Sequence, residues 1–315
     1  MGAALMLART ADSMFWLARY MERMDSIARL IEAAQMMTGV ASEAEEWQSA
    51  LIAAGCNDGF SQKYETAGPT SAALFLGFDR DNPSAIINCL ERARINARAM
   101  RTALTRDMWN AVNDAWLEAR SLSERSFSPA RLPETLDWIK TVSSRFFGAY
   151  SGNMLRNEAY WFTRLGTFIE RADNTARILD VKYHVLLPDY ESVGGALDYY
   201  QWTSILRAVS AVRAYQWVYR GEVAPWNVAE LLILRPEMPR SLRACYGEIN
   251  ECLNFLADAH GGARGECHRR AGAMESQLRY GRIADIFQSG LHEYLTDVID
   301  RTGILGNEIA AFYMR

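Results

Sequence analysis

Two stretches of the sequence carry the same charged residues at the same spacing. LARYMERMDSIARLI covers residues 17–31, and LGTFIERADNTARIL covers residues 165–179. Six of the fifteen aligned positions are identical: Leu17/Leu165, Glu22/Glu170, Arg23/Arg171, Asp25/Asp173, Ala28/Ala176 and Arg29/Arg177. The repeated motif is E-R-x-D-x-x-x-R. Because its charges recur while the apolar residues around them differ, it is the candidate functional site.

The residue types in this motif suit the binding of anionic groups. An arginine guanidinium grips a carboxylate or a phosphate through two parallel hydrogen bonds. A glutamate whose pKa is raised in a dry cleft can also act as a general acid or base. The candidate catalytic residues are therefore Glu22 and Glu170. The candidate ligand-binding residues are Arg19, Arg23, Asp25, Arg29, Arg171, Asp173 and Arg177.

The same pattern also has a purely structural interpretation. A helix turns about 100° per residue, which places Glu22, Asp25 and Arg29 opposite the apolar face. Asp25 and Arg29 are then an i,i+4 pair, as are Asp173 and Arg177, and such a pair adds only about 0.2–0.5 kcal/mol on an exposed helix. A charged cleft built from both copies and a solvated helix face both remain open.

Other catalytic and metal-binding motifs are missing or incomplete. The E-x-x-D spacing suits Mg²⁺ or Mn²⁺, but the adjacent arginines disfavour a cation, and no E-x-x-H motif is present to build a di-iron bundle. His260, Cys267 and His268 form only part of a ligand set. The sequence also lacks the glycine-rich nucleotide-binding motifs and the G-x-S-x-G nucleophile elbow. We therefore expect no metal and no cofactor.

The amino-acid composition and net charge favour a globular protein that does not bind nucleic acid. Half of the 315 residues are hydrophobic and 23% are charged, which is typical of a globular chain, and the net charge of −4 disfavours a nucleic-acid binder. No run of about 18 apolar residues is present, so we expect no membrane span. Five cysteines without a C-x-x-C pair favour buried, reduced thiols. The N-terminal residues lack a signal-peptide pattern, so we expect a cytoplasmic protein.

Helical spacing recurs along the chain, and β-branched alternation does not. We expect helices over residues 12–37, 43–54, 71–77, 84–105, 108–121, 134–151, 157–186, 199–220, 225–234, 239–259 and 277–315. A helix stop is expected at Pro188, a loop through Gly194 and Gly195, and a linker over residues 260–268.

The duplication extends beyond the charged motif. WQSAL at 47–51 matches WTSIL at 202–206, and Pro83 matches Pro239. Each half therefore holds a charged-motif helix, a Trp-led helix and a Pro-started helix in that order. We predict one all-α domain over residues 1–315. It is a multi-helix bundle of two tandem halves, approximately 6–150 and 151–315, related by pseudo-twofold symmetry.

Four stretches together carry a family resemblance: TADSMFWLARYMERMDSIARL, DRDNPSAI, ERARINARAMR and FIERADNTARIL. They resemble the bacterial alpha-E domain family, and the resemblance covers nearly the whole chain. The family is all-helical, tandemly duplicated and marked by a glutamate–arginine motif, which maps onto Glu22-Arg23 and Glu170-Arg171. Family members often have an arginine three positions before the second glutamate, where this chain has Thr167, so we expect the two halves to differ.

The resemblance implies a setting rather than a reaction. Alpha-E proteins are typically encoded beside circularly permuted ATP-grasp ligases, transglutaminase-like proteins and sometimes NTN-type peptidases. The leading hypothesis is therefore an accessory component of a peptide or amide-bond synthesis system, which binds the ligase, its peptide substrate or product, or both. One alternative is an enzyme that acts on amide or ester bonds with glutamate as general acid or base. A second alternative is a scaffold protein with purely structural motifs. A homodimer is a separate hypothesis, motivated by the aromatic content.

Overall fold

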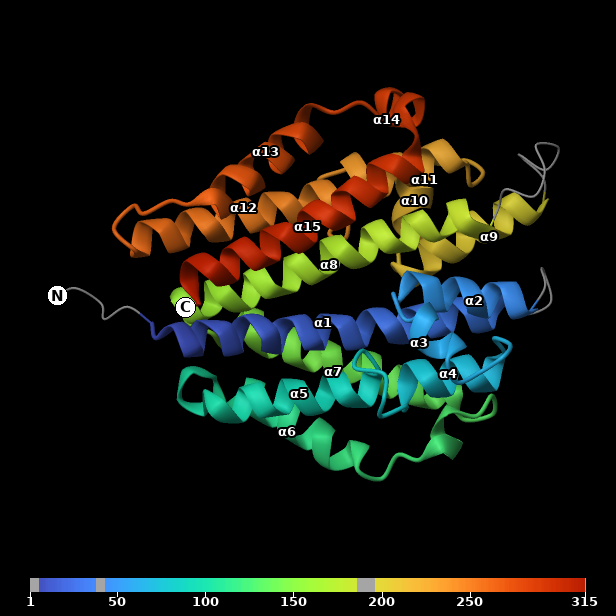
Figure 1. Cartoon of the computed structure of the whole chain (residues 1–315), viewed down its shortest axis with the longest axis horizontal. Coiled ribbons are helices and arrows are strands. Elements are labelled where there is room, and N and C mark those ends of the chain that lie inside the picture. The colour runs from blue at the N-terminus through green and yellow to red at the C-terminus, as the bar shows by residue number, and fades with distance from the viewer. Residues whose placement is uncertain (1–5, 38–42, 186–195, 315) are drawn as a thin grey trace.

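The computed structural model describes residues 6–37, 43–185 and 196–314, and every regular element in these ranges is a helix (Figure 1). The predicted all-α bundle is confirmed in this part of the chain. The first half holds α1 (Ala8–Met37), α2 (Glu43–Ala53), α3 (Asn57–Ser61), α4 (Pro69–Gly77), α5 (Ile86–Ala99), α6 (Arg106–Ala119) and α7 (Leu132–Asn153). The second half holds α8 (Glu158–Val185), α9 (Ala196–Ala208), α10 (Val212–Tyr219), α11 (Pro225–Leu234), α12 (Leu242–Ala259), α13 (Glu266–Tyr280), α14 (Ile283–Ser289) and α15 (Leu291–Tyr313).

Side chains and prolines fix several helix starts. The Thr105 hydroxyl accepts a hydrogen bond from the Met108 amide at 3.2 Å, and the Ser241 hydroxyl accepts one from the Ala244 amide at 3.0 Å. These bonds satisfy amides that have no partner inside the first turn of a helix. Helix α11 begins at Pro225, as predicted, because proline lacks the amide hydrogen that the first turn leaves unpaired.

Three predicted segments are wrong in extent. The helix expected over residues 199–220 is broken between α9 and α10, where Ser210 adopts a positive φ of 56° that no helix continues through. The expected linker over residues 260–268 ends early, because α13 starts at Glu266. The helix expected from residue 277 is three helices, interrupted after Tyr280 and at Gly290, whose φ is 95°. The stop at Pro188 and the loop at Gly194 lie outside the described residues.

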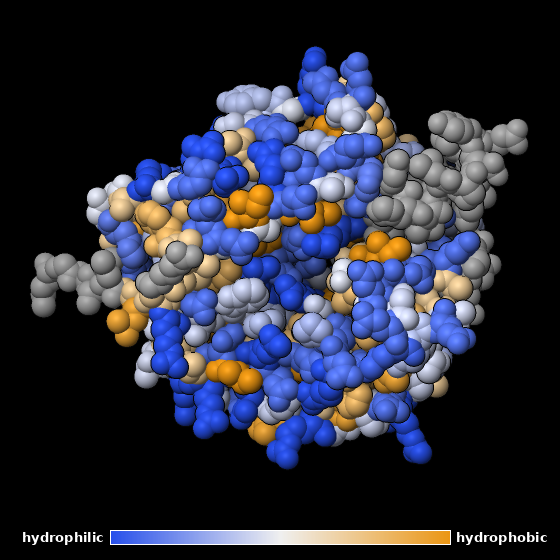
Figure 2. All heavy atoms as spheres, in the orientation of Figure 1, coloured by the Kyte–Doolittle hydropathy of each residue, from blue (hydrophilic) through white to orange (hydrophobic). Residues whose placement is uncertain are grey.

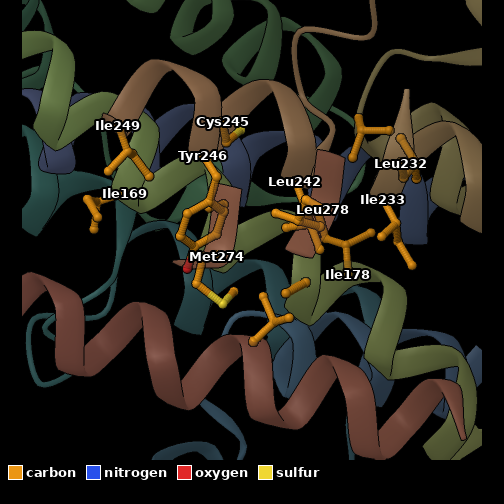
Figure 3. Packing of buried hydrophobic residues seen from close by; sticks show 14 of the residues in the cluster. Ile169, Ile178, Leu232, Ile233, Leu242, Cys245, Tyr246, Ile249, Met274 and Leu278 are labelled. Atoms are coloured by element: carbon orange, nitrogen blue, oxygen red, sulfur yellow. The ribbon is translucent and has the colours of Figure 1, made fainter. Parts of the chain in front are cut away.

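The charged-motif helices α1 and α8 run side by side and in the same direction through the middle of the molecule (Figure 1). Helices α5 and α7 pack against α1, and α12 and α15 pack against α8. Apolar residues form two core clusters, one mainly from each half. Figure 3 shows the second cluster, in which side chains of α8, α11, α12 and α13 gather between the helices. The α1–α8 pair is therefore the seam between two cores.

The two central helices approach closely at Gly166 of α8. A Cβ atom placed there would lie 2.2 Å from the Phe15 carbonyl oxygen of α1 and 3.0 Å from the carbonyl carbon. Both are backbone atoms of a buried helix and cannot swing aside as a side chain can. The close approach therefore requires glycine at this position.

Replacing Gly166 with alanine should push α1 and α8 apart. We expect Gly166→Ala to lower the free energy of unfolding by about 1–3 kcal/mol, the usual cost of overpacking. Gly148→Ala is the matched control, because Gly148 lies in α7 and a Cβ there meets nothing within 4 Å. The control should leave stability unchanged or raise it by up to about 1 kcal/mol. Urea denaturation of both variants measures the difference, and equal stabilities would contradict the close approach.

Candidate functional site

The parallel packing of α1 and α8 brings the two charged motifs face to face. Glu22 of α1 lies opposite Arg171 of α8, and Arg23 of α1 lies opposite Glu170 of α8. Glutamate and arginine are adjacent in each copy of the motif. The Glu-Arg dipeptide of each helix therefore supplies one carboxylate and one guanidinium to the dipeptide of the other helix. We call these reciprocal ion pairs the Glu-Arg exchange.

The carboxylate of Glu170 is held by two arginines of α1. Arg23 donates from Nε to Oε1 at 2.5 Å and from Nη2 to Oε2 at 3.1 Å, which is a bidentate contact. Arg19 donates from Nε to Oε2 at 2.7 Å, and its guanidinium carbon lies 4.5 Å from the centre of the Trp16 ring. Glu170 is only 1% exposed, so its charge is neutralised inside the protein.

The carboxylate of Glu22 also has two arginine partners. Arg171 donates from Nε to Oε1 at 2.9 Å and from Nη2 to Oε2 at 2.8 Å. Arg240 donates from Nη1 to Glu22 Oε1 at 2.7 Å and from Nη2 to Asp25 Oδ2 at 2.9 Å. Glu22 has no exposed surface. Both glutamates are thus saturated, but their second arginines come from different places in the sequence.

Arg240 is the site residue that sequence reasoning missed. The position in α8 that matches Arg19 is Thr167, whose hydroxyl donates to the Thr163 carbonyl oxygen instead of meeting Glu22. Arg240, in the turn before α12, is instead the second arginine partner of Glu22. The Thr175 hydroxyl donates a hydrogen bond to the backbone carbonyl oxygen of Arg240 at 2.8 Å and so holds this turn against α8. Two features of the sequence could have pointed to Arg240. Thr167 stands where an arginine partner of Glu22 would be expected by analogy with Arg19, and Arg240 directly follows the matched Pro239.

The remaining motif residues flank the exchange. Arg29 donates from Nε to Asp25 Oδ2 and Arg177 donates from Nε to Asp173 Oδ2, both at 2.7 Å, as the i,i+4 spacing predicts. Next to the exchange, the Asn174 amide donates to the Ser26 hydroxyl at 3.0 Å, which joins another pair of matched positions. All nine candidate site residues therefore lie along the α1–α8 seam.

The arginines keep both glutamates ionised. Burial by itself would raise the pKa of Glu22, but the charges of Arg171 and Arg240 outweigh it and lower the pKa to about 2. Burial likewise opposes ionisation of Glu170, yet Arg23 and Arg19 lower its pKa. A carboxylate with a lowered pKa is a poor general acid or base near neutral pH. Asp173 differs, because burial raises its pKa in spite of Arg177.

Each glutamate belongs to a cluster of three arginines and two carboxylates, its own carboxylate included. The first cluster holds Glu22, Asp25, Arg29, Arg171 and Arg240, and the second holds Glu170, Asp173, Arg19, Arg23 and Arg177. The arginine side chains keep between 15% and 35% of their surface exposed. On the face shown in Figure 2, hydrophilic side chains surround a hollow near the centre, over α1 and α8. The clusters thus combine buried carboxylates with a surplus of partly exposed positive charge.

Two cysteines occupy matched places beside the exchange. Cys89 of α5 is influenced by the charges of Arg23 and Glu170, and Cys245 of α12 by those of Arg171 and Glu22. Burial raises the pKa of both thiols to about 12, so they pack as neutral side chains. All five cysteines are free and buried, as predicted.

The described residues hold neither a cluster of metal-ligating side chains nor a helix suited to cross a membrane. No group of three or more histidine, cysteine, aspartate and glutamate side chains there lies close enough to hold a metal ion. No helix in the described ranges combines the length and the apolar character that crossing a membrane requires.

Comparison with known proteins settles the family. Residues 6–314 match the family model named Alpha-E, described as a predicted alpha-helical domain with a conserved ER motif. The chain belongs to the Alpha-E family. The two Glu-Arg dipeptides of the exchange, Glu22-Arg23 and Glu170-Arg171, lie within the matched residues. In this Alpha-E chain, these two dipeptides lie where α1 and α8 meet.

Curated relatives of this Alpha-E chain include an uncharacterized protein of Mycobacterium bovis and two uncharacterized proteins of Mycobacterium tuberculosis. Each is 22% identical to it over 93% of the chain. The chain spans only 36% of the length of these relatives. No solved structure matches it.

Removing Arg240 should leave Glu22 with one cation and Asp25 with only Arg29. We expect Arg240→Ala to lower the free energy of unfolding by about 2 kcal/mol, since hydrogen bonds to buried charges contribute about 1.5–3 kcal/mol. Arg213→Ala, on the exposed surface of α10, is the control and should stay within about 0.5 kcal/mol of wild type. Guanidinium denaturation measures the free energy of unfolding of both variants. If Arg240→Ala is as stable as wild type, Arg240 does not contribute to the site.

Stability should also depend on pH through Glu22. Its pKa is lower in the folded protein than in the unfolded chain, so its contribution is complete above about pH 4.5 and is lost as the pH falls through about 2. Glu22→Gln lacks this titration. The stability gap between wild type and Glu22→Gln should therefore be largest at neutral pH and shrink below pH 4.5. Thermal unfolding from pH 2.5 to 7 measures the gap, and a constant gap would show that ionisation of Glu22 is unimportant.

Proposed function

We propose that this Alpha-E chain is an accessory binding component of a cytoplasmic peptide or amide-bond synthesis system. It works with a circularly permuted ATP-grasp ligase and transglutaminase-like proteins. In this proposal, the Glu-Arg exchange joins the two halves, and the surplus arginine charge of each cluster receives carboxylates of a peptide or of a partner protein. Catalysis belongs to the partners.

The observation that carries the proposal is the saturation of both glutamates. Glu22 and Glu170 are fully buried, and each accepts hydrogen bonds from two arginines. Buried ions need such partners, because an uncompensated charge in the protein interior is strongly destabilising. Residues held in this way are suited to fixing the arrangement of two helices rather than to transferring protons.

The charge of the clusters supports the choice of ligand. Each cluster has one more arginine than carboxylates, and Arg177 keeps 35% of its side chain exposed. A guanidinium with free N–H groups at the surface binds a carboxylate in a planar, bidentate geometry. Peptide C-termini and acidic side chains are carboxylates, so the substrates and products of amide-bond synthesis match this chemistry.

The setting rests on the family resemblance and on the length of the relatives. The family resemblance implies a gene setting beside circularly permuted ATP-grasp ligases and transglutaminase-like proteins. Most of each mycobacterial relative lies outside the region that matches this chain, which leaves room for further domains in the same polypeptide. A domain that occurs within longer chains is well suited to act together with a neighbour. Homodimer formation stays a separate prediction.

The enzyme hypothesis with Glu22 or Glu170 as general acid or base has less support from the geometry. It requires a glutamate with a raised pKa, whereas the arginines lower the pKa of both. It does predict a specific result: Glu170→Gln would abolish an activity of the isolated chain while the fold stays intact. The accessory proposal predicts that the isolated chain has no such activity.

The test is ATP turnover by the partner ligase with candidate amino acids and peptides, measured with and without this chain. We expect the chain to form a complex at micromolar concentration and to raise turnover. Arg177→Ala should reduce the increase at least fivefold, because it removes the most exposed arginine of the second cluster and leaves the exchange intact. The control is Arg213→Ala, which should behave as wild type.

Two results would contradict the proposal. One is the absence of both a complex and a change in turnover when nucleotide and peptide are present. The other is hydrolysis or transfer by the isolated chain that a folded Glu170→Gln variant has lost. Circular dichroism of each variant separates a lost function from a lost fold.

A further inference from the structure

A small cavity lies between the two halves, beside the seam formed by α1 and α8. It has a volume of about 60 Å³. Four helices supply its walls: α1, α2, α8 and α9. A water molecule occupies about 30 Å³ of liquid, so the space holds about two waters or a chain of about three heavy atoms.

Matched positions of the two halves line this cavity in pairs. Leu30 pairs with Ile178, counting from the aligned charged motifs, and the aligned Trp-led helices supply three more pairs: Ser49/Ser204, Ala50/Ile205 and Ala53/Ala208. The walls are mostly apolar, with many alanine methyl groups. The two serines are only half-buried, so the cavity reaches the surface on their side.

One lining residue breaks the apolar pattern. Glu46 of α2 is 8% exposed, and its Oε1 atom is buried without a hydrogen-bond partner. No salt bridge joins Glu46 to a cation within the described part of the chain. Gln201, at the matched position in α9, also has a buried Oε1 atom without a partner, but it carries no charge. The cavity therefore has a carboxylate from one half only.

This carboxylate is unlike those of the Glu-Arg exchange. Burial, together with the negative charge of neighbouring Glu45, raises the pKa of Glu46 to about 7. The exchange shows what the same fold does with a buried glutamate that has cations beside it. Glu46 lacks that compensation, and a buried carboxylate without a partner is costly unless a ligand supplies one.

We propose that this cavity binds the end of a primary alkylammonium group, with the cation on Glu46 and the short aliphatic part against the alanine, leucine and isoleucine side chains. The amine end of a lysine-like side chain and a small free amine share this chemistry. An ammonium group supplies three N–H donors and the positive charge that Glu46 lacks.

The size and the lining set the limits of the ligand class. An anion would meet the Glu46 carboxylate, and a neutral hydrocarbon would leave its Oε1 atom unpaired. An aromatic ring needs more room, since a cavity that holds benzene measures about 150 Å³. Two carbons and one nitrogen fit the available space. This site is independent of the proposed accessory function, because it requires no ligase.

Ethylammonium chloride titrated into the isolated chain, followed by NMR of alanine methyl groups, tests the proposal. We expect saturable shifts at the cavity alanines, Ala50 and Ala208 among them. Ethanol is the matched neutral probe and should bind at least tenfold more weakly. Glu46→Gln should lower ethylammonium affinity at least tenfold, and it should still fold because it removes a buried charge.

A second variant fills the space without touching Glu46. Ala50→Val adds two carbon atoms at a position whose match, Ile205, already carries a branched side chain, so it should fold and block binding. Equal responses to ethanol and ethylammonium, unchanged binding by Glu46→Gln, or a crystal structure in excess ethylammonium with only water in the cavity would each overturn the proposal. These outcomes leave the ligase experiment unaffected, so the two proposals fail separately.

Discussion

The reciprocal pairing of two buried glutamates with arginines on the opposite helix is the constraint on which this structure depends. A buried carboxylate must meet a cation, and Glu22 meets Arg171 while Glu170 meets Arg23 because α1 and α8 lie parallel with the two motifs level. A shift of one helix by a single turn would break the bidentate contacts of Glu22 with Arg171 and of Glu170 with Arg23. The exchange therefore fixes the register of the central helices, and through them the relation of the two halves.

The seam combines this polar exchange with a close approach of the two backbones toward one end. Gly166 lets α8 approach the backbone of α1 at Phe15, while the charged residues occupy the middle of the interface. Each half then packs its own core on the outer side of its central helix. Two cores joined by specific ion pairs have less freedom to slide than two cores joined by hydrophobic contact, because hydrophobic contact is non-directional.

In each half, the buried glutamate is neutralised by two arginines, but the second arginine comes from a different place in the two halves. Glu170 takes its second arginine, Arg19, from the helix that faces it, whereas Glu22 takes Arg240 from the turn before α12. A similar difference separates Glu46 from Gln201 in the cavity between the halves. The two halves share matched positions, and the residues that differ at these positions give the halves separate properties. The residues that distinguish the two halves of this Alpha-E chain, Arg240 and Glu46, lie where matched positions carry different residues.

The sequence by itself determined the helical class and showed the same charged residues at the same spacing in two places, because these depend on local spacing and on comparison of the chain with itself. It also placed the i,i+4 pairs, whose partners lie one turn apart. Only the tertiary structure decided that Glu22 meets Arg171, that Arg240 completes the first cluster and that Glu46 has no cation. These contacts join residues separated by up to 218 positions, and their existence depends on which helix faces come together. Local periodicity identified the apolar face of each central helix, but the packing of the whole chain buried the glutamates of the opposite face as well and selected their partners.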